Sequence, residues 1–277
     1  MRPPRLDEIG YWSEVKLHIV REYATAYSVI MEKQQKIRSY GYIDAFAGAG
    51  THISKQTGKM VAGSPLNALL IDPPFAKHHF IDLDGGRASK LQQLTKEMGN
   101  VEVHEGDCNQ ILVQDVFPRY RFEDYRRALC LLDPYGLHVD WSVLKTAGNL
   151  RSIEIFYNFM IMDANMNVFW RNPDKVAVKQ KNRMDAVWGD HSWRDVAYKK
   201  STGLFEDMEE KAPNKEIAEA FRKRLKEAAG FKFVPEPVPM RNSKGAVVYY
   251  LFFASANKTG EKIVKDIFNK YRQKGAR

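Results

Sequence analysis

The chain has 277 residues, of which 44% are apolar. This composition excludes a disordered protein, and the length allows one large domain with a substantial core, so we expect a single domain over residues 1–277. No run approaches the roughly 18 to 20 apolar residues that cross a bilayer, and the polar start differs from a signal peptide, so we expect a cytoplasmic protein without membrane segments.

The net charge of +9 is unevenly placed. Residues 211–277 hold 16 of the 43 basic residues but only 6 of the 34 acidic ones, so the excess lies at the C-terminal end. Such a region suits a partner that carries phosphates, but a solvated helix face has the same composition. Both interpretations stay open.

An amphipathic helix is predicted within an N-terminal helical part, residues 8–38. Ser13 is the expected N-cap, and Val15, Ile19 and Tyr23 recur at helical spacing. Strand and helix signals then alternate through a core at 39–159, with strands expected in 40–50, 78–87, 101–112, 127–136 and 152–159. Strands separated by helices predict a parallel, doubly wound sheet.

The pattern changes after residue 159. Residues 160–212 read as a helical insertion whose tryptophans lie near basic residues, which suits either core packing, the favoured role, or stacking on single-stranded nucleic acid. Residues 213–277 predict a helix at 214–229 with Gly230 as C-cap, two strands joined by "RNSKG", and a helix at 257–273. The predicted fold is therefore Rossmann-like, with a mostly parallel seven-stranded sheet that ends in an antiparallel hairpin.

A cofactor site is expected at the strand ends. "DAFAGAG" brings Asp44, Phe46, Gly48 and Gly50 directly after the first strand, where glycines allow close approach of a ligand to the backbone. The carboxyl ends of parallel strands meet at one edge of the sheet, so this segment lies beside the ends of the next two strands.

Acidic residues follow those two strands. Asp82, with Asp84 as second choice, can accept both hydroxyl groups of a ribose. Asp107 can receive the exocyclic amine of an adenine while the backbone around Cys108 holds the ring. A dinucleotide would need a third glycine in GxGxxG, which is absent because "THISK" follows Gly50. The cofactor predicted is S-adenosylmethionine, and a dinucleotide-dependent oxidoreductase is disfavoured.

The fourth strand ends in "DPYG", residues 133–136. A site that methylates an exocyclic amine benefits from fixed acceptors, which the Asp133 carboxylate and the Pro134 carbonyl provide. The ring of Tyr135 can stack under a flipped or unpaired base. The alternative is a plain turn built on Asp-Pro.

These motifs resemble class I S-adenosylmethionine-dependent methyltransferases. "DPYG" is similar to the D-P-P-Y motif of amino-methyltransferases and to the D-P-F/Y-G motif of tRNA guanine-N2 dimethyltransferases. "YIDAFAGAG", "GSPLNALL", "FIDLD", "GDCN", "DPYG" and "YYLFFAS", in this order, resemble the bacterial three-Cys-motif partner protein family from Trp12 to Phe268. The resemblance implies a protein partner with three clustered cysteines. Two departures are the long stretch between Gly50 and Ser64 and the missing second proline.

The leading hypothesis is an N-methyltransferase that acts on a nucleic-acid base, DNA or RNA. The alternative is a non-catalytic adapter that binds nucleic acid or the cysteine-rich partner. Cys108 and Cys130 have no CxxC spacing, which indicates buried thiols. No metal site is predicted, because the following histidines show no ligand spacing along the chain: His52, His78, His79, His104, His138 and His191.

Overall fold

The computed structural model describes residues 8–200 and 209–274. The strands are β1 (Glu8–Ile9), β2 (Ser39–Asp44), β3 (Thr51–Ser54), β4 (Met60–Ala62), β5 (Lys77–Asp82), β6 (Val101–Glu105), β7 (Arg126–Leu132), β8 (Ile153–Phe159), β9 (Tyr198–Lys200), β10 (Glu209–Lys211), β11 (Val238–Arg241) and β12 (Val247–Ala254). The α-helices are α1 (Tyr11–Glu32), α2 (Ser64–Leu69), α3 (Gly85–Thr95), α4 (Cys108–Ile111), α5 (Trp141–Leu150), α6 (Ile161–Asn167), α7 (Val178–Trp188), α8 (Trp193–Ala197), α9 (Asn214–Glu227) and α10 (Lys258–Lys274). A π-helical turn η1 (Leu112–Val116) and two 3-10 turns, η2 (Phe117–Arg119) and η3 (Pro173–Lys175), complete the set.

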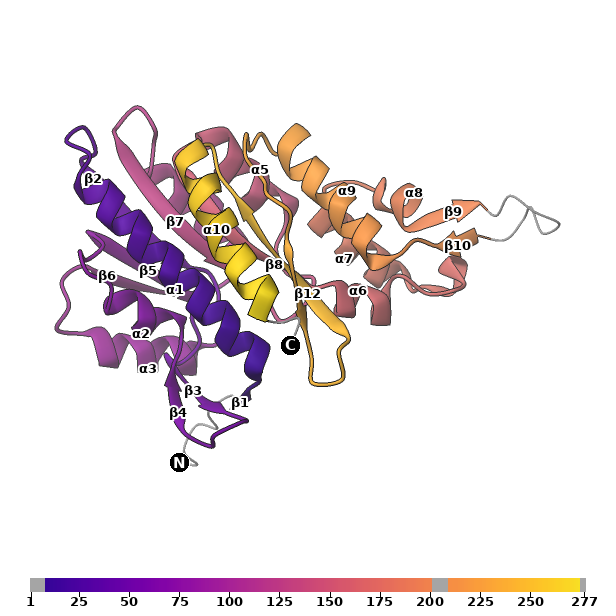
Figure 1. Cartoon of the computed structure of the whole chain (residues 1–277), viewed down its shortest axis with the longest axis horizontal. Coiled ribbons are helices and arrows are strands. Elements are labelled where there is room, and N and C mark those ends of the chain that lie inside the picture. Colours follow the sequence, from indigo (N-terminus) through magenta and orange to yellow (C-terminus); the bar gives the residue numbers. More distant parts are fainter. Residues whose placement is uncertain (1–7, 201–208, 275–277) are drawn as a thin grey trace.

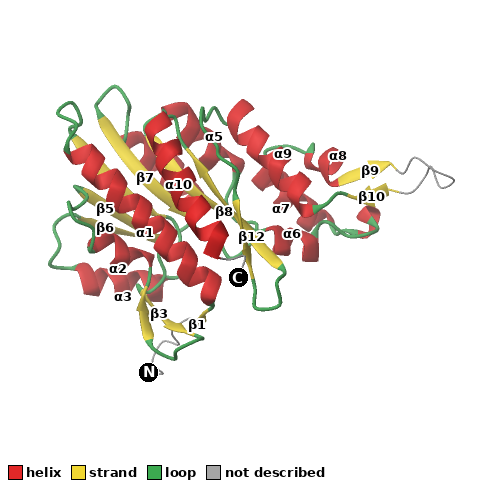
Figure 2. Cartoon of the chain, in the orientation of Figure 1, coloured by secondary structure: helices red, strands yellow, loops and turns green. Residues whose placement is uncertain are grey.

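Seven strands form the central sheet in the order β11-β12-β8-β7-β2-β5-β6 (Figure 2). The strands β8, β7, β2, β5 and β6 run parallel to one another, whereas β12 is antiparallel to both β8 and β11. The predicted Rossmann-like sheet with a terminal antiparallel hairpin is confirmed. The chain leaves β2 toward β6 and then returns to place β7 on the other side of β2, so the strand order reverses there. Ligands of open α/β sheets bind in the crevice at such a reversal.

Helices cover both faces of the sheet. Side chains of α1, α2, α3 and α10 pack on one face, where α1 and α10 run side by side (Figure 1). Side chains of η1, α5 and α9 pack on the other. Successive residues of a strand point to opposite faces, so Tyr42 of β2 joins the first cluster and Ile43 the second.

The start of α1 differs from the prediction. The helix begins at Tyr11 with Gly10 as its N-cap, and the backbone N–H groups of Ser13 and Glu14 donate to the Gly10 carbonyl at 3.0 and 3.2 Å. The prediction of Ser13 as N-cap is therefore wrong. The reason is that β1 pairs with β3 and leads the chain into the helix earlier than its apolar spacing indicates.

Two short sheets lie outside the central one. The stretch after Gly50 folds into β3 and β4, which with β1 form a three-stranded sheet before α2. The insertion at 160–212 contains the antiparallel pair β9–β10 in addition to the predicted helices. Trp188 and Trp193 are buried, as core packing requires, whereas Trp170 is 43% exposed.

The C-terminal elements follow the predicted order. The helix α9 ends at Glu227 with Ala228 as its C-cap, so the predicted cap Gly230 lies two residues further on. Among the strands described, β11 lies at the edge of the sheet, where its proline-rich segment needs fewer backbone donors. Within residues 8–200 and 209–274, no helix is long and apolar enough to cross a membrane.

Candidate active site

The segments that follow β2, β5, β6 and β7 lie together at one end of the sheet. The backbone N–H of Ala45 donates to the Leu131 carbonyl at 3.0 Å, that of Ala47 to Ile81 at 2.9 Å, and that of Gly106 to Asp82 at 3.0 Å. These bonds join neighbouring strand ends into one continuous rim. The rim carries Asp44, Asp82, Asp107 and Asp133, which come from four different strand ends.

Asp82 holds the glycine turn against the second strand end. Its Oδ2 accepts from the backbone N–H of Gly48 at 2.8 Å, and its Oδ1 accepts from the N–H of Asp84 at 2.8 Å. Gly48 has a φ of +64°, which L side chains rarely adopt, and nothing lies within 4 Å of the position that a Cβ would take. The turn thus leaves open space above a backbone that a ligand can approach closely.

Asp84 and Asp107 both cap helices. The Asp84 carboxylate accepts from the N–H of Arg87 at the start of α3, and the Asp107 carboxylate accepts from the N–H of Asn109 at the start of α4, both at 2.9 Å. Both residues are exposed, and a carboxylate has acceptor sites beyond one cap. Burial raises the pKa of Cys108 to about 12, so this thiol is neutral.

Asp44 is fully buried at the end of β2. Burial raises the pKa of its carboxyl group to about 7, against the hydrogen bonds from Ser64 and from the backbone N–H of Phe46, which lower it. Its Oδ2 has no hydrogen-bond partner among the residues that the structure describes. A buried carboxylate oxygen without a donor is costly, so this atom is suited to a cationic ligand group.

Asp133 lines a cavity of about 200 Å³ next to the glycine turn. Its Oδ2 accepts from Nζ of Lys16 on α1, and its Oδ1 accepts from Nδ2 of Asn158 on β8. Pro134 is buried below, whereas the Tyr135 side chain is 68% exposed. The cavity wall also includes Phe46, Gly48, His52, Ser64 and Tyr249.

The cavity brings together the two halves of the predicted site. Phe46 and Gly48 from the cofactor half share its wall with Asp133, Pro134 and Tyr135, and Ser64 connects the wall to Asp44. Asp82, Asp84, Asp107 and Cys108 lie along the rim outside this cavity, on the next two strand ends, and Gly50 also lies outside it. The predicted roles of these residues stay predictions, but their placement on one rim is what binding a single extended ligand requires.

Lys16 and Asn158 are site residues that the sequence reasoning missed. The sequence has an unusual feature at each of these two positions. Lys16 lies three and seven residues before Ile19 and Tyr23, on the apolar stripe of the helix, where a cation needs a buried partner. Asn158 is an uncharged polar residue near the end of the otherwise apolar run "IFYNF".

No protein-family model and no curated protein matches this chain. Several solved structures, however, are similar to this chain. Protein LPL1258 from Legionella pneumophila has 10% sequence identity and a TM-score of 0.54, over 92% of this chain and 91% of that one. A S-adenosylmethionine-dependent methyltransferase from Clostridium acetobutylicum has 12% identity and a TM-score of 0.42, over 87% and 92% of the two chains. The putative methyltransferase yhhF from Escherichia coli has 12% identity and a TM-score of 0.38, over 86% of each.

At these identities the similarity concerns the fold. The chain shares its Rossmann-like α/β fold with protein LPL1258, and it has the strand order and the antiparallel hairpin described above. Membership of the three-Cys-motif partner family stays a prediction.

Proposed function

We propose that this protein is an S-adenosylmethionine-dependent N-methyltransferase that acts on an exocyclic amine of a nucleic-acid base. The observation that carries the proposal is the shared cavity, whose wall joins the glycine turn after β2 to the Asp133-Pro134-Tyr135 segment after β7. A methyl donor and its acceptor must meet in one place, and this cavity lies where the strand order reverses.

The residues at the rim fit the cofactor. The unpartnered Oδ2 of Asp44 suits the ammonium group of its amino-acid part, and the open turn at Gly48 suits a close approach to the backbone. Asp82 or Asp84 would hold the ribose, and Asp107 the adenine amine. When bound, the cofactor supplies a methyl group on a positively charged sulfur, which leaves with the bonding electrons as a neutral thioether.

Asp133 would position the amine of the acceptor. In the structure its Oδ2 already accepts from a nitrogen donor, the Lys16 ammonium group. Because each carboxylate oxygen has more than one acceptor site, an incoming N–H can join Lys16 at this carboxylate. As the amine nitrogen forms its bond to the methyl carbon, it becomes positively charged, and its surplus proton passes to the Asp133 carboxylate or to water.

A surface lined by aromatic and basic side chains supports nucleic acid as the substrate. Two cavities of about 500 and 760 Å³ share Trp12 and Arg241 in their walls. The larger one also shares Ser13, Val248 and Tyr249 with the Asp133 cavity, so the three cavities adjoin one another. We call this surface the hairpin groove. One end of it borders the proposed catalytic residues.

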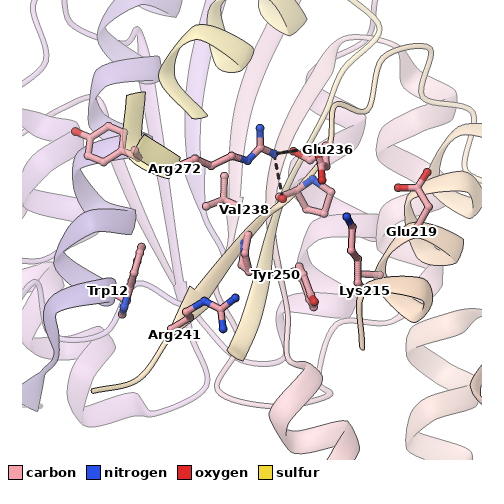
Figure 3. A pocket seen from close by; sticks show the side chains of 12 residues that line it. Trp12, Lys215, Glu219, Glu236, Val238, Arg241, Tyr250 and Arg272 are labelled. Carbon is pink, nitrogen blue, oxygen red and sulfur yellow. Dashed lines mark hydrogen bonds and ion pairs between the residues drawn. The ribbon is translucent and has the colours of Figure 1, made fainter. Parts of the chain in front are cut away.

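Cations outnumber carboxylates in the two outer cavities of the hairpin groove. Arg241 of β11, Tyr250 of β12 and Lys215 of α9 surround its outer part (Figure 3). Lys55 and Arg272 add two more cations, against the carboxylates of Glu219 and Glu236. Aromatic rings beside cations bind single strands by stacking and by neutralising phosphates.

One observation favours the adapter as a second candidate. Both oxygens of Asp133 are engaged, by Lys16 and by Asn158, which is how a purely structural acid would look. In that case the site would hold no methyl donor, and the protein would act by binding nucleic acid or a cysteine-rich protein partner.

Titration calorimetry with S-adenosylmethionine and a transfer assay with labelled cofactor on total RNA and genomic DNA test the proposal. We expect saturable cofactor binding and labelled nucleic acid. The D133A variant should lose transfer while its cofactor affinity stays within about twofold, because Asp133 acts on the acceptor. D124A, which removes an exposed acid before β7, is the matched control and should retain both.

An absence of heat in the titration would favour the adapter. Equal loss of transfer and of cofactor affinity in D133A would mean that Asp133 serves folding or cofactor binding instead.

A further inference from the structure

A cluster of two histidines and one glutamate lies on β5 and β6, at the opposite edge of the central sheet from β11 and the hairpin groove. The register of β5 and β6 places His79 beside Glu102, and the two-residue repeat of a strand places Glu102 and His104 on the same face of β6. The histidines show no ligand spacing along the chain. Only the pairing of two strands that are far apart in sequence brings them together.

The three potential ligand atoms are close enough to share one ion. His79 Nδ1 lies 3.2 Å from His104 Nε2, and Glu102 Oε2 lies 3.6 Å from the first atom and 4.0 Å from the second. Ligand atoms bound to tetrahedral zinc at about 2.0 to 2.2 Å lie about 3.3 to 3.5 Å apart. Shifts of a few tenths of an ångström would therefore complete the geometry.

The outward nitrogens of both rings face oxygens of the kind that metal-bound histidines use, that of His79 within hydrogen-bond distance and that of His104 slightly beyond it. His79 Nε2 lies 3.1 Å from the Tyr120 hydroxyl group. His104 Nδ1 faces Asp115 Oδ2 at 3.9 Å. A hydroxyl or carboxylate that accepts from the far ring nitrogen fixes the tautomer that leaves the other nitrogen free to bind a metal.

The donor atoms of the cluster suit a cation. Imidazole nitrogens and a carboxylate oxygen are ligands that divalent zinc accepts, and all three atoms lie within 4.8 Å of one another.

Arg119 and Lys77 now neutralise Glu102, and Lys77 Nζ lies 3.5 Å from Glu102 Oε1. Arg119 Nη1 lies 2.6 Å from Glu102 Oε2, and its Nε and Nη2 contact Asp115 Oδ1 at 3.2 and 2.6 Å. Because Asp115 also binds the guanidinium group, Arg119 can release Oε2 to an ion and keep its contacts with Asp115. The side chains of Glu102 and Arg119 are 34% and 39% exposed, which gives an ion access from solvent.

We propose that His79, Glu102 and His104 bind one divalent transition-metal ion of the zinc type, with water in the fourth position. The ion would fasten β6, an edge of the sheet, to β5 and to the turns η1 and η2. The site is separate from the proposed catalytic cavity, so a result for or against metal binding does not affect the methyl-transfer proposal.

Calorimetric titration of untagged, EDTA-treated protein with zinc chloride tests the proposal. We expect one ion per chain with a Kd of about 1 µM or tighter, and a higher melting temperature in its presence. The H104A and E102Q variants should weaken binding by at least about 100-fold, and D115N by about 10-fold. H18A, which removes an exposed histidine of α1, should bind as the wild type does.

Cobalt(II) provides a second readout on the wild-type chain, because a tetrahedral site with two imidazoles gives visible absorption bands that free cobalt lacks. This measurement needs no variant and is unaffected if H104A fails to fold. An absence of stoichiometric zinc binding, or unchanged binding in both H104A and E102Q, would overturn the proposal.

Discussion

Glu154 of β8 is the clearest buried acid outside the candidate active site. It accepts hydrogen bonds from the hydroxyl groups of Tyr23 and Ser255, the latter at 3.0 Å. These bonds link α1, β8 and the end of β12. Burial raises the pKa of Glu154 to about 7, although both hydrogen bonds lower it. The folded chain therefore keeps a proton that the unfolded chain releases.

This difference makes stability depend on pH. Between the ordinary glutamate pKa of 4.5 and about 7, the folded state binds more protons than the unfolded state, so the free energy of unfolding falls as pH rises. Above about pH 7, the free energy of unfolding has lost the whole contribution that protonated Glu154 makes. The histidines with lowered pKa values, His78 and His79, act with the opposite sign below pH 6.5, so only a comparison with a variant isolates Glu154.

The E154Q variant should remove this cost. From pH 5 to pH 8 its free energy of unfolding, measured with urea, should fall less than that of the wild type, by on the order of 1 to 3 kcal/mol. E97Q alters an exposed acid and should follow the wild-type profile. Parallel profiles for wild type and E154Q would show that Glu154 is ionised in the folded state throughout.

At the same scale, the placement of the four acids was easier to predict than the contacts that they make. Asp44, Asp82, Asp107 and Asp133 follow strands, and that position alone places them on one rim. Lys16 reaches Asp133 from 117 residues away, a contact that depends on how α1 lies on the sheet.

At the scale of the elements, α5 packs directly against the backbone of the segment after α9. A Cβ at Gly148 would lie 1.9 Å from the Ala229 carbonyl oxygen, which belongs to the segment after α9. The two chain segments approach so closely that no side chain fits between them. The glycine is thus required by a contact between elements, since its own φ is not positive.

The G148A variant should lose about 1 to 3 kcal/mol of unfolding free energy, because either α5 or the segment at 228–231 must move. Chemical denaturation measures the loss. G99A is the control, because nothing lies within 4 Å of the position that its Cβ would occupy. A loss below about 0.5 kcal/mol in G148A would mean that the two segments separate easily.

The elements themselves were predictable to different degrees. The five parallel strands and the long helices α1, α9 and α10 follow from apolar periodicity, because each buries a face against a large core. The pairs β3–β4 and β9–β10 did not follow, since short exposed strands carry little apolar pattern. Their pairing depends on neighbours that the local sequence does not specify.

At the scale of the whole molecule, the hairpin groove combines parts that lie far apart in the chain. Trp12 precedes the sheet, Lys215 belongs to α9, and Arg241 lies on the last edge strand. The basic excess of residues 211–277 thus contributes to a surface that leads to Asp133. Its binding energy for a nucleic acid should be largely electrostatic.

Single-stranded RNA or DNA should bind K215A/R241A more weakly than wild type, with a salt dependence whose slope is smaller by about 2, because each of the two cations neutralises about one phosphate. Fluorescence anisotropy at several salt concentrations gives both quantities. K145A removes an exposed lysine of α5, away from the groove, and should change neither. An unchanged slope in K215A/R241A would place the nucleic acid elsewhere.

The α/β class, the parallel direction of the core strands and the position of the acids at strand ends follow from the amino-acid sequence alone. These features depend on local periodicity and on the rule that parallel strands end on the same side. Which side chains come together depends on the fold: Lys16 with Asp133, His79 with Glu102 and His104, and Trp12 and Arg241 in the wall of the hairpin groove. Such contacts depend on strand register and on helix packing across the sheet, which residues far apart in the chain set jointly.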